Sequence, residues 1–271
     1  MIDIHTHLLP GFDDGARNIA EAVEMAFQAR DDGIEAAIAT PHILEPGRPH
    51  REEILAAVAE MRAIFAERGV NLDLFPGAEI LIDPALPELL AEGRLMTICD
   101  AGRHLLLELP LAEMPRYTES VVFELLTLGV TPILAHPERN RDLARDPRLL
   151  HRLVERGCLV QLSTGSIRGR FGREAERAAR AFLREDLVHF LGTDAHGADH
   201  RRPLMAAAAA KAAEICGPEK ARALVEENPR RLLDGLPIPS SGPESRRSTK
   251  ARGVLGFFRR IGMALLPEYW K

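Results

Sequence analysis

The 271-residue sequence has few cysteines and few aromatic side chains, and both shortages narrow what it encodes. It holds three cysteines, Cys99, Cys158 and Cys216, with no Cys-x-x-Cys pair, so neither a disulfide framework nor a thiolate zinc knuckle is expected. Aromatic residues make up only 5% of the chain. With 46% hydrophobic and 28% charged residues, the composition is nevertheless that of a globular protein.

Long apolar runs and an excess of basic charge are missing as well. No segment approaches the roughly 18 uninterrupted apolar residues that a membrane-spanning helix requires, and residues 1–5 do not begin a secretory signal. Lysine and arginine number 35 against 40 aspartates and glutamates, a formal net charge of -5, which excludes a globally basic nucleic-acid-binding protein. We therefore expect a cytoplasmic protein that binds no nucleic acid.

The sequence does contain a regular alternation of short apolar segments with longer segments of helical periodicity. Such alternation is typical of βα units around a parallel sheet. Seven units within about 235 residues favour one α/β barrel over two domains. The predicted strands cover residues 2–4, 36–39, 72–79, 105–109, 132–135, 159–162 and 188–192, and the predicted helices include residues 19–32, 51–68 and 118–128.

Five glycines punctuate this alternation. Each follows a predicted helix and precedes the next strand, where the C-terminal cap of a helix favours a residue with positive φ. These glycines are Gly33, Gly69, Gly93, Gly129 and Gly157.

The composition changes near the C-terminus, which divides the chain. We expect a barrel over residues 1–236, a linker rich in proline, serine and basic residues over 237–252, and an amphipathic basic tail over 253–271. Residues 240–271 carry a net charge of +5 and residues 1–239 one of -10. One helical face of the tail would hold Val254, Phe257, Phe258, Ile261 and Leu265.

Histidines and carboxylates follow the ends of most predicted strands. In an α/β barrel the C-terminal ends of the strands form one face, where side chains distant in sequence converge and active sites lie. A loop after the first strand adds one more carboxylate within reach. The nine residues are His5, His7, Asp14, His42, Glu79, Glu108, His136, Asp194 and His196.

These nine side chains predict a metal site. One histidine at a strand end is usually structural, but packing nine such groups without metal would bury many unsatisfied polar atoms. Imidazole and carboxylate without thiolate favour Mn, Fe, Zn or Co. With bridging carboxylates and waters, nine side chains approach the roughly 15 to 18 contacts of three ions. Three divalent ions and four carboxylates together would carry a net charge of +2, which suits a dianionic phosphate.

Arginines close in sequence to these residues add candidate phosphate contacts. Arg139 lies three residues after His136, and Arg201 and Arg202 lie five and six residues after His196. Guanidinium groups beside metal ions bind phosphoryl oxygens in both the ground state and the transition state. The sequence thus combines metal-ligating and phosphate-binding residues.

Six short motifs contain most of these residues. They are His5-Thr6-His7, Asp13-Asp14-Gly15, Thr40-Pro41-His42, Pro76-Gly77-Ala78-Glu79, His136-Pro137-Glu138-Arg139 and Thr193-Asp194-Ala195-His196. In this order they resemble the polymerase-and-histidinol-phosphatase (PHP) superfamily, and within it the bacterial metal-dependent tyrosine-protein phosphatases of capsule and exopolysaccharide gene clusters. The resemblance covers residues 1–235, and residues 115–117 and 164–172 also look like this branch.

The resemblance implies a distorted (β/α)7 TIM-like barrel of the PHP type with three divalent ions, manganese being the most expected. It also implies a metal-dependent phosphomonoesterase that hydrolyses phosphotyrosine on proteins, in which a metal-bridging hydroxide attacks phosphorus. By the family's pattern, one ion would be held by His5, His7, Glu79 and Asp194, a second by Glu79, Glu108 and His136, and a third by Asp14, His42 and His196.

The catalytic residues implied by the resemblance are Arg139, one of the two adjacent arginines, and His42. Counting from His196 selects Arg201, whereas the proline that follows selects Arg202, so this phosphate contact stays open. A phenolate leaving group, with a pKa of about 10, needs little protonation. His42 or a water would serve as a proton donor for poorer leaving groups.

The expected partner is a phosphotyrosine protein, namely a membrane-associated bacterial tyrosine kinase that controls capsular or exopolysaccharide synthesis. The basic tail is a candidate for peripheral contact with the inner face of the membrane. The alternative is a helix that packs on its own barrel or at an oligomer contact.

Two motifs mimic other phosphate chemistry, and two other functions stay open. Cys216 and Arg222 match Cys-x5-Arg, but Cys216 follows a helix rather than a strand, so we predict no thiolate nucleophile. Residues 164–172 are rich in glycine but lack the Gly-Lys-Ser/Thr of a nucleotide-binding loop, so they are expected to shape the rim of the site. The alternative functions are a phosphatase for a small metabolite such as histidinol phosphate and a non-catalytic metal-binding regulator.

Overall fold

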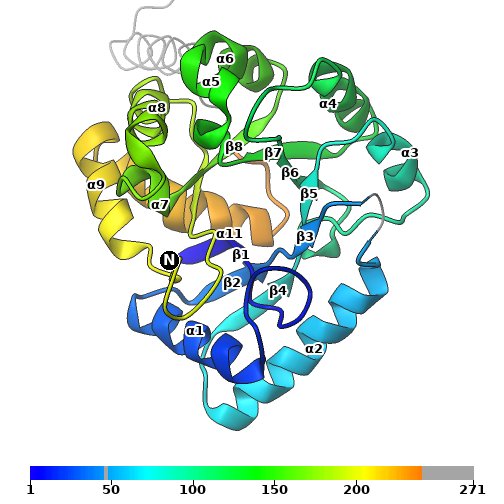
Figure 1. Cartoon of the computed structure of the whole chain (residues 1–271), viewed down its shortest axis with the longest axis vertical. Coiled ribbons are helices and arrows are strands. Elements are labelled where there is room, and N and C mark those ends of the chain that lie inside the picture. The colour runs from blue at the N-terminus through cyan, green and yellow to red at the C-terminus, as the bar shows by residue number, and fades with distance from the viewer. Residues whose placement is uncertain (46–47, 240–271) are drawn as a thin grey trace, which may run out of the picture.

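The computed structural model describes residues 1–45 and 48–239 (Figure 1). Most of the predicted linker and the whole amphipathic tail lie outside the described residues. In the described part of the chain, no helix combines the length and the apolar character that crossing a membrane requires.

Parallel strands form the centre of the molecule, in two hydrogen-bonded sheets (Figure 1). The smaller sheet has the order β1-β2-β4, and the larger has the order β3-β5-β6-β7-β8-β9. The strands are β1 (Ile2–Thr6), β2 (Ala36–Ala39), β3 (His42–Ile43), β4 (Asp73–Pro76), β5 (Glu79–Leu81), β6 (His104–Glu108), β7 (Thr131–Ala135), β8 (Leu159–Ser163) and β9 (Phe190–Gly192).

Two strand positions are split, which the sequence did not predict. The predicted strand at residues 72–79 is interrupted between β4 and β5, and β3 continues the direction of β2 after a break of two residues. Gly77 lies in the first break, where a Cβ atom would come within 2.8 Å of Cγ2 of Ile38. The close approach of these two segments therefore favours glycine at this position.

The first and last strand positions are neighbours. The N–H of Asp194 donates to the carbonyl of His5 at 2.8 Å, and the N–H of His7 donates to the carbonyl of Ala195 at 2.9 Å. If β2 and β3 are counted as one strand, and β4 and β5 as another, the strands follow one another around the molecule in chain order. This is the predicted α/β barrel of seven units, distorted at the two breaks.

Helices cover the outside of the strands (Figure 1). The predicted helix at residues 51–68 is found with the same bounds, and those at 19–32 and 118–128 each end one residue earlier. The helices are α1 (Ile19–Asp31), α2 (Arg51–Arg68), α3 (Leu86–Ala91), α4 (Thr118–Thr127), α5 (Arg141–Arg145), α6 (Pro147–Glu155), α7 (Thr164–Ile167), α8 (Gly172–Arg184), α9 (Ala206–Cys216), α10 (Pro218–Arg222) and α11 (Asn228–Leu233). Short helical turns lie at Ile98–Asp100, Pro137–Arg139 and Ala223–Glu227.

The glycines predicted to end helices adopt the expected backbone conformation. Their φ angles are 89° at Gly33, 70° at Gly69, 70° at Gly93, 81° at Gly129 and 111° at Gly157. Each angle lies in the region that residues with a Cβ atom rarely adopt. The prediction of helix ends from these glycines is confirmed.

The core has two layers, because alternate residues of a strand face opposite sides of a sheet. Ile4, Ile38, Ile133 and Phe190 belong to a small buried cluster formed by alternate strand residues, which Leu232 of α11 joins. The residues between them pack against the helices in a larger cluster. Apolar side chains thus fill the interior of the barrel, and the polar site lies at the C-terminal ends of the strands.

Candidate metal centre

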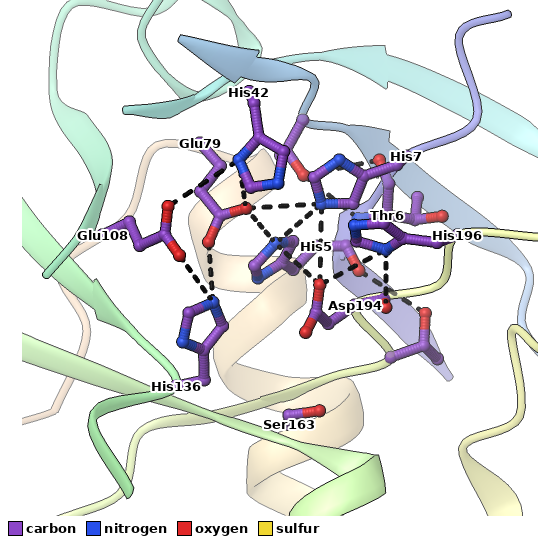
Figure 2. A network of polar contacts seen from close by, with 12 residues as sticks. His5, Thr6, His7, His42, Glu79, Glu108, His136, Ser163, Asp194 and His196 are labelled. Atoms are coloured by element: carbon purple, nitrogen blue, oxygen red, sulfur yellow. Dashed lines mark hydrogen bonds and ion pairs between the residues drawn. The ribbon is translucent and has the colours of Figure 1, made fainter. Parts of the chain in front are cut away.

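All nine side chains predicted as metal ligands lie together beyond the C-terminal ends of the strands. Figure 2 labels all of them except Asp14. Six of the nine are buried, His42 and Glu108 are half-buried, and Asp14 comes from an exposed loop. Their ligand atoms form three overlapping groups, namely His5, Glu79, His136 and Asp194; His7, Asp14, His42 and His196; and His42, Glu79 and Glu108.

The first predicted ligand set converges on one point. Nε2 of His5 lies 3.0 Å from Oε2 of Glu79, 3.2 Å from Nε2 of His7 and 3.6 Å from Oδ1 of Asp194. Nε2 of His7 lies 3.3 Å from the same Glu79 oxygen and 3.6 Å from the same Asp194 oxygen. Four ligand atoms from three distant parts of the chain therefore surround one position.

The other two predicted sets are also near neighbours. Nε2 of His136 lies 2.8 Å from Oε1 of Glu79 and 3.8 Å from Oε1 of Glu108. Oδ1 of Asp14 lies 3.6 Å from Nε2 of His42 and 3.3 Å from Nε2 of His196.

His42 and Glu79 stand between the predicted sets. Nδ1 of His42 lies 3.2 Å from Oε2 of Glu79, so the imidazole also faces the carboxylates of the first two sets. The two oxygens of Glu79 face different groups, since Oε1 lies beside His136 and Oε2 beside His5. This geometry suits a carboxylate that bridges two ions.

Several buried atoms of this cluster lack hydrogen-bond partners, and this observation tests whether metal fits. They are Nδ1 of His42, Oε2 of Glu79 and Nε2 of His196. Buried polar atoms in native proteins almost always have a partner. Nitrogen and oxygen atoms that face a common centre without one are suited to divalent cations, so the residues present fit the predicted group.

Two residues that the sequence did not single out as site residues hold the imidazoles in place. Oδ2 of Asp13 lies 2.7 Å from Nδ1 of His7 and accepts the N–H of His42 at 2.9 Å. Oε1 of Gln161 lies 3.0 Å from Nδ1 of His5. Such contacts direct the opposite nitrogen, Nε2, toward the centre. A polar residue within the buried strand β8 was the only sequence signal for Gln161.

The carboxylates of the cluster divide into two kinds. Burial alone would raise the pKa of Glu79, but His5 and His136 outweigh it, so the pKa lies well below its usual value. Burial is likewise outweighed at Asp194, where His5 and His7 lower the pKa. Burial and the charge of Glu79 instead raise the pKa of Glu108 to about 7. The site is therefore built around two firmly ionised carboxylates.

The pKa values of the imidazoles are shifted in opposite directions by their surroundings. Burial lowers the pKa of His196 to about 2, with a further contribution from His7, and burial also lowers the pKa of His42. Burial is outweighed at His5 by Glu79 and Asp194, which raise its pKa. At His7 it is outweighed by hydrogen bonds to Asp13 and Asp194.

Two of the three candidate arginines reach the metal centre. Nη1 of Arg139 donates to Oδ2 of Asp194 at 2.8 Å, and Arg201 forms an ion pair with Oδ1 of the same carboxylate. The Nε–H of Arg202 instead donates to Oε1 of Gln28 on α1 at 2.9 Å. Arg201 rather than Arg202 therefore faces the candidate ligands.

The ring of Phe171 lies beneath both guanidinium groups at the site. It is 4.3 Å from Cζ of Arg139 and 5.7 Å from Cζ of Arg201, measured to the ring centroid. An added Cβ on Gly165 would lie 2.6 Å from this ring, so glycine at that position makes room for it. Phe171 was not predicted as a site residue, because nothing in the local sequence pairs it with arginines distant along the chain.

Three site residues have left-handed backbone conformations. The φ angles are 31° at His136, 53° at Asp194 and 47° at Arg201. Residues other than glycine adopt such angles at an energetic cost, and they gather at functional sites.

A family model for capsular polysaccharide synthesis proteins, CpsB/CapC, matches residues 1–234. The chain belongs to the CpsB/CapC family.

Several CpsB/CapC relatives carry the name tyrosine-protein phosphatase. The chain is 36% identical over 204 residues to tyrosine-protein phosphatase YwqE of Bacillus subtilis, a match that covers 74% of this chain and 79% of the relative. It is 29% identical over 239 residues to tyrosine-protein phosphatase CpsB of Streptococcus pneumoniae, covering 86% of this chain and 98% of the relative.

A solved CpsB/CapC structure has the same fold. It comes from work on YwqE from Bacillus subtilis and CpsB from Streptococcus pneumoniae, described as unique metal-dependent tyrosine phosphatases. The TM-score is 0.84 at 33% sequence identity, covering 90% of this chain and 99% of the solved chain.

Neither of the two sequence motifs that mimic other phosphate chemistry forms the site that it resembles. Cys216 ends α9, its Sγ–H donates to the carbonyl of Ala212 at 3.1 Å, and burial raises the pKa of its thiol, the opposite of an activated nucleophile. Residues 164–172 are not one open loop, because Thr164–Ile167 form α7 and α8 begins at Gly172.

Proposed function

We propose that this CpsB/CapC protein is a metal-dependent phosphomonoesterase that hydrolyses phosphotyrosine on proteins. The observation that carries the proposal is the convergence of unpartnered, buried nitrogen and oxygen atoms beside two arginines. The relatives named as tyrosine-protein phosphatases support the same reaction and substrate class. Three divalent ions bound by four carboxylates would leave a net charge of +2, which suits a dianionic phosphate.

We propose that nine side chains hold three divalent ions, with manganese as the expected metal. Bound ions would stabilise negative charge on the phosphoryl oxygens and lower the pKa of bound water to about 7. Glu79 is proposed as the bridging carboxylate, because its two oxygens face different groups of imidazoles. The proposed ligands are His5, His7, Asp14, His42, Glu79, Glu108, His136, Asp194 and His196.

The protein's own residues would bind and orient the phosphate. Arg139 and Arg201, which now contact Asp194, would donate hydrogen bonds to the phosphoryl oxygens. Both guanidinium groups already point to the centre, so little conformational freedom is lost on binding. His42 is the most exposed imidazole of the centre, with 18% of its side chain accessible, and would donate a proton to poorer leaving groups.

The proposed physiological substrate is a membrane-associated bacterial tyrosine kinase that controls capsular or exopolysaccharide synthesis. The proposed organisation is a phosphatase barrel over residues 1–236, a linker over 237–252 and a basic tail over 253–271 that contacts the inner face of the membrane. Deleting residues 240–271 should weaken binding to anionic liposomes. Unchanged liposome binding would contradict the membrane role of the tail.

Turnover of a phosphotyrosine peptide tests the central proposal. Purified protein should release phosphate from the peptide, lose this activity on chelation, and regain it when Mn²⁺ is added. Histidinol phosphate at the same concentration should be hydrolysed far more slowly. Faster hydrolysis of histidinol phosphate would favour a small-metabolite phosphatase, and no turnover with metals shown to be bound would favour a non-catalytic regulator.

A further inference from the structure

A cavity of about 310 Å³ adjoins the proposed phosphate site, and arginines dominate its wall. Two segments distant in sequence form it, namely the turn between α7 and α8 and the chain between β9 and α9. The residues that line it and matter here are Arg168, Arg170, Phe171, Arg201 and Arg202.

The cavity and the metal centre share a wall. Arg201 lines the cavity and forms an ion pair with Asp194. Phe171 also lines the cavity, and its ring lies beneath the guanidinium of Arg139. A group bound in the cavity would therefore lie beside the guanidinium groups that receive the phosphate.

The charge of this cavity is not neutralised by its own wall. No aspartate or glutamate lines it, and within residues 1–45 and 48–239 neither Arg168 nor Arg170 forms an ion pair within 4.0 Å. Arg202 donates to the neutral side chain of Gln28, which leaves its charge unpaired. Like charges held together without a counter-charge attract an anionic ligand.

A second cavity at the metal centre has the opposite character. Asp13, Asp14, Glu45 and Glu108 line it together with His42, against a single arginine, Arg48. An anionic part of a substrate would be repelled there before metals bind. The two cavities thus differ in the sign of their charge, so an acidic group beside the phosphotyrosine would favour the arginine-lined cavity.

We propose that the arginine cavity binds a second anionic group of the substrate, either a carboxylate side chain or a phosphate close in sequence to the phosphotyrosine. This inference rests on the proposed function. Because an extended peptide advances about 3.3 Å per residue, the second anion is expected within about three residues of the phosphotyrosine. Charge-assisted contacts to Arg168, Arg170 and Arg202 would hold it.

The test compares peptides that differ in a single residue near the phosphotyrosine. One series places aspartate at each position from three before to three after it, a second places phosphoserine there, and the reference peptide has alanine throughout. The ratio of kcat/KM for an acidic peptide to that for the reference should be on the order of tenfold at the best position. Aspartate and phosphoserine together identify which anion the cavity prefers.

Two double variants with the same change in charge locate the effect. Arg168→Gln with Arg170→Gln should bring the ratio close to one. Arg177→Gln with Arg184→Gln removes two exposed arginines of α8 that do not line the cavity, and should leave the ratio as in the wild type. Each variant is scored by the ratio of kcat/KM for the acidic peptide to kcat/KM for the reference peptide. A change in the fraction of folded or metal-loaded protein affects both values equally and cancels in this ratio.

Three results would overturn the inference, and they separate it from the proposed function. Equal kcat/KM for all peptides in the wild type would refute the second anion site while leaving phosphotyrosine hydrolysis intact. A preference for acidic peptides that survives in the Arg168 and Arg170 double variant would place the second anion site elsewhere on the protein. Failure to hydrolyse any peptide with metals bound would refute the proposed function, and this inference with it.

Discussion

At the scale of single residues, the candidate centre depends on side chains that are not predicted ligands but contact the predicted ligands. Asp13 and Gln161 each contact the Nδ1 atom of an imidazole whose Nε2 atom faces the centre. Histidine has two ring nitrogens, and the contact at one sets the role of the other. The positions of these supporting residues therefore decide whether the predicted ligands can act together.

Replacing Asp13 by asparagine should weaken metal binding without unfolding the protein. The amide keeps the size of the side chain but loses the charge beside His7, so we expect metal affinity about 10-fold to 100-fold lower. Isothermal titration calorimetry of the metal-free protein with Mn²⁺ measures this change in metal affinity. Asp31→Asn on the exposed surface of α1 is the matched control, and equal affinity in both variants would contradict the role of Asp13.

Replacing Phe171 by leucine should impair phosphate binding more than the chemical step. The ring attracts the guanidinium groups of Arg139 and Arg201, and each such contact contributes about 1 kcal/mol. We expect KM for a small aryl phosphate to rise about fivefold or more with a smaller change in kcat. Phe171→Tyr keeps an aromatic face and should restore KM; failure to do so would show that packing alone matters.

At the scale of secondary-structure elements, irregular backbone at the strand ends shapes the site. The breaks after β2 and β4 re-aim the chain just before His42 and Glu79, and left-handed residues follow the ends of β7 and β9. Bulges and strained residues of this kind redirect side chains near functional sites. The regular parts of the strands supply the scaffold, and the irregular ends aim the side chains.

Two glycine-to-alanine substitutions should separate loop geometry from backbone strain. At Gly15 a Cβ atom would lie 2.3 Å from the carbonyl oxygen of His7, so the loop that carries Asp14 must move. At Gly69 nothing lies within 4 Å, and alanine strains only the positive φ, at about 1 kcal/mol. We expect Gly15→Ala to lose metal and activity, and Gly69→Ala to lower the melting temperature only. Normal metal content in Gly15→Ala would contradict this account.

At the scale of the whole molecule, the barrel separates two environments. Its C-terminal end gathers charged and ligating groups, whereas its interior and its helix-facing layer are apolar. Burial away from this end can hold a titratable residue in its neutral form. His189, which precedes β9, is an example, because burial lowers its pKa to about 3 and Lys220 adds to the effect.

Acid should destabilise the fold partly through His189. An unfolded histidine has a pKa of about 6.5, so below this pH the unfolded chain binds a proton that the folded protein does not. The free energy of unfolding should therefore fall by about 1.4 kcal/mol per pH unit from this residue, from pH 6.5 down toward its folded pKa. Nδ1 of His189 also accepts the N–H of Val160 at 3.0 Å, which requires an unprotonated nitrogen.

NMR of the imidazole signals tests this prediction directly. The His189 signal, assigned by its loss in His189→Gln, should keep its position between pH 7.5 and 5.5. A signal that moves with a midpoint near 6.5 would contradict the buried, neutral state.

Much of the fold could be predicted, since local rules determine its elements. The helix at residues 51–68 and the positive φ at Gly33 and Gly69 depend on short-range periodicity and capping. The close approach of Gly77 to Ile38 could not be predicted, because Ile38 lies on another strand.

The sequence by itself determined that the chain is an α/β protein and which residue types end its strands, since period and composition are properties of neighbours along the chain. It also placed nine candidate ligands at one end of a barrel, because parallel strands share their direction. Only the tertiary structure decided that Arg201 rather than Arg202 faces the centre, that Phe171 supports both arginines, and that Asp13 and Gln161 orient the imidazoles. These contacts join segments far apart in sequence, and only folding brings such segments together.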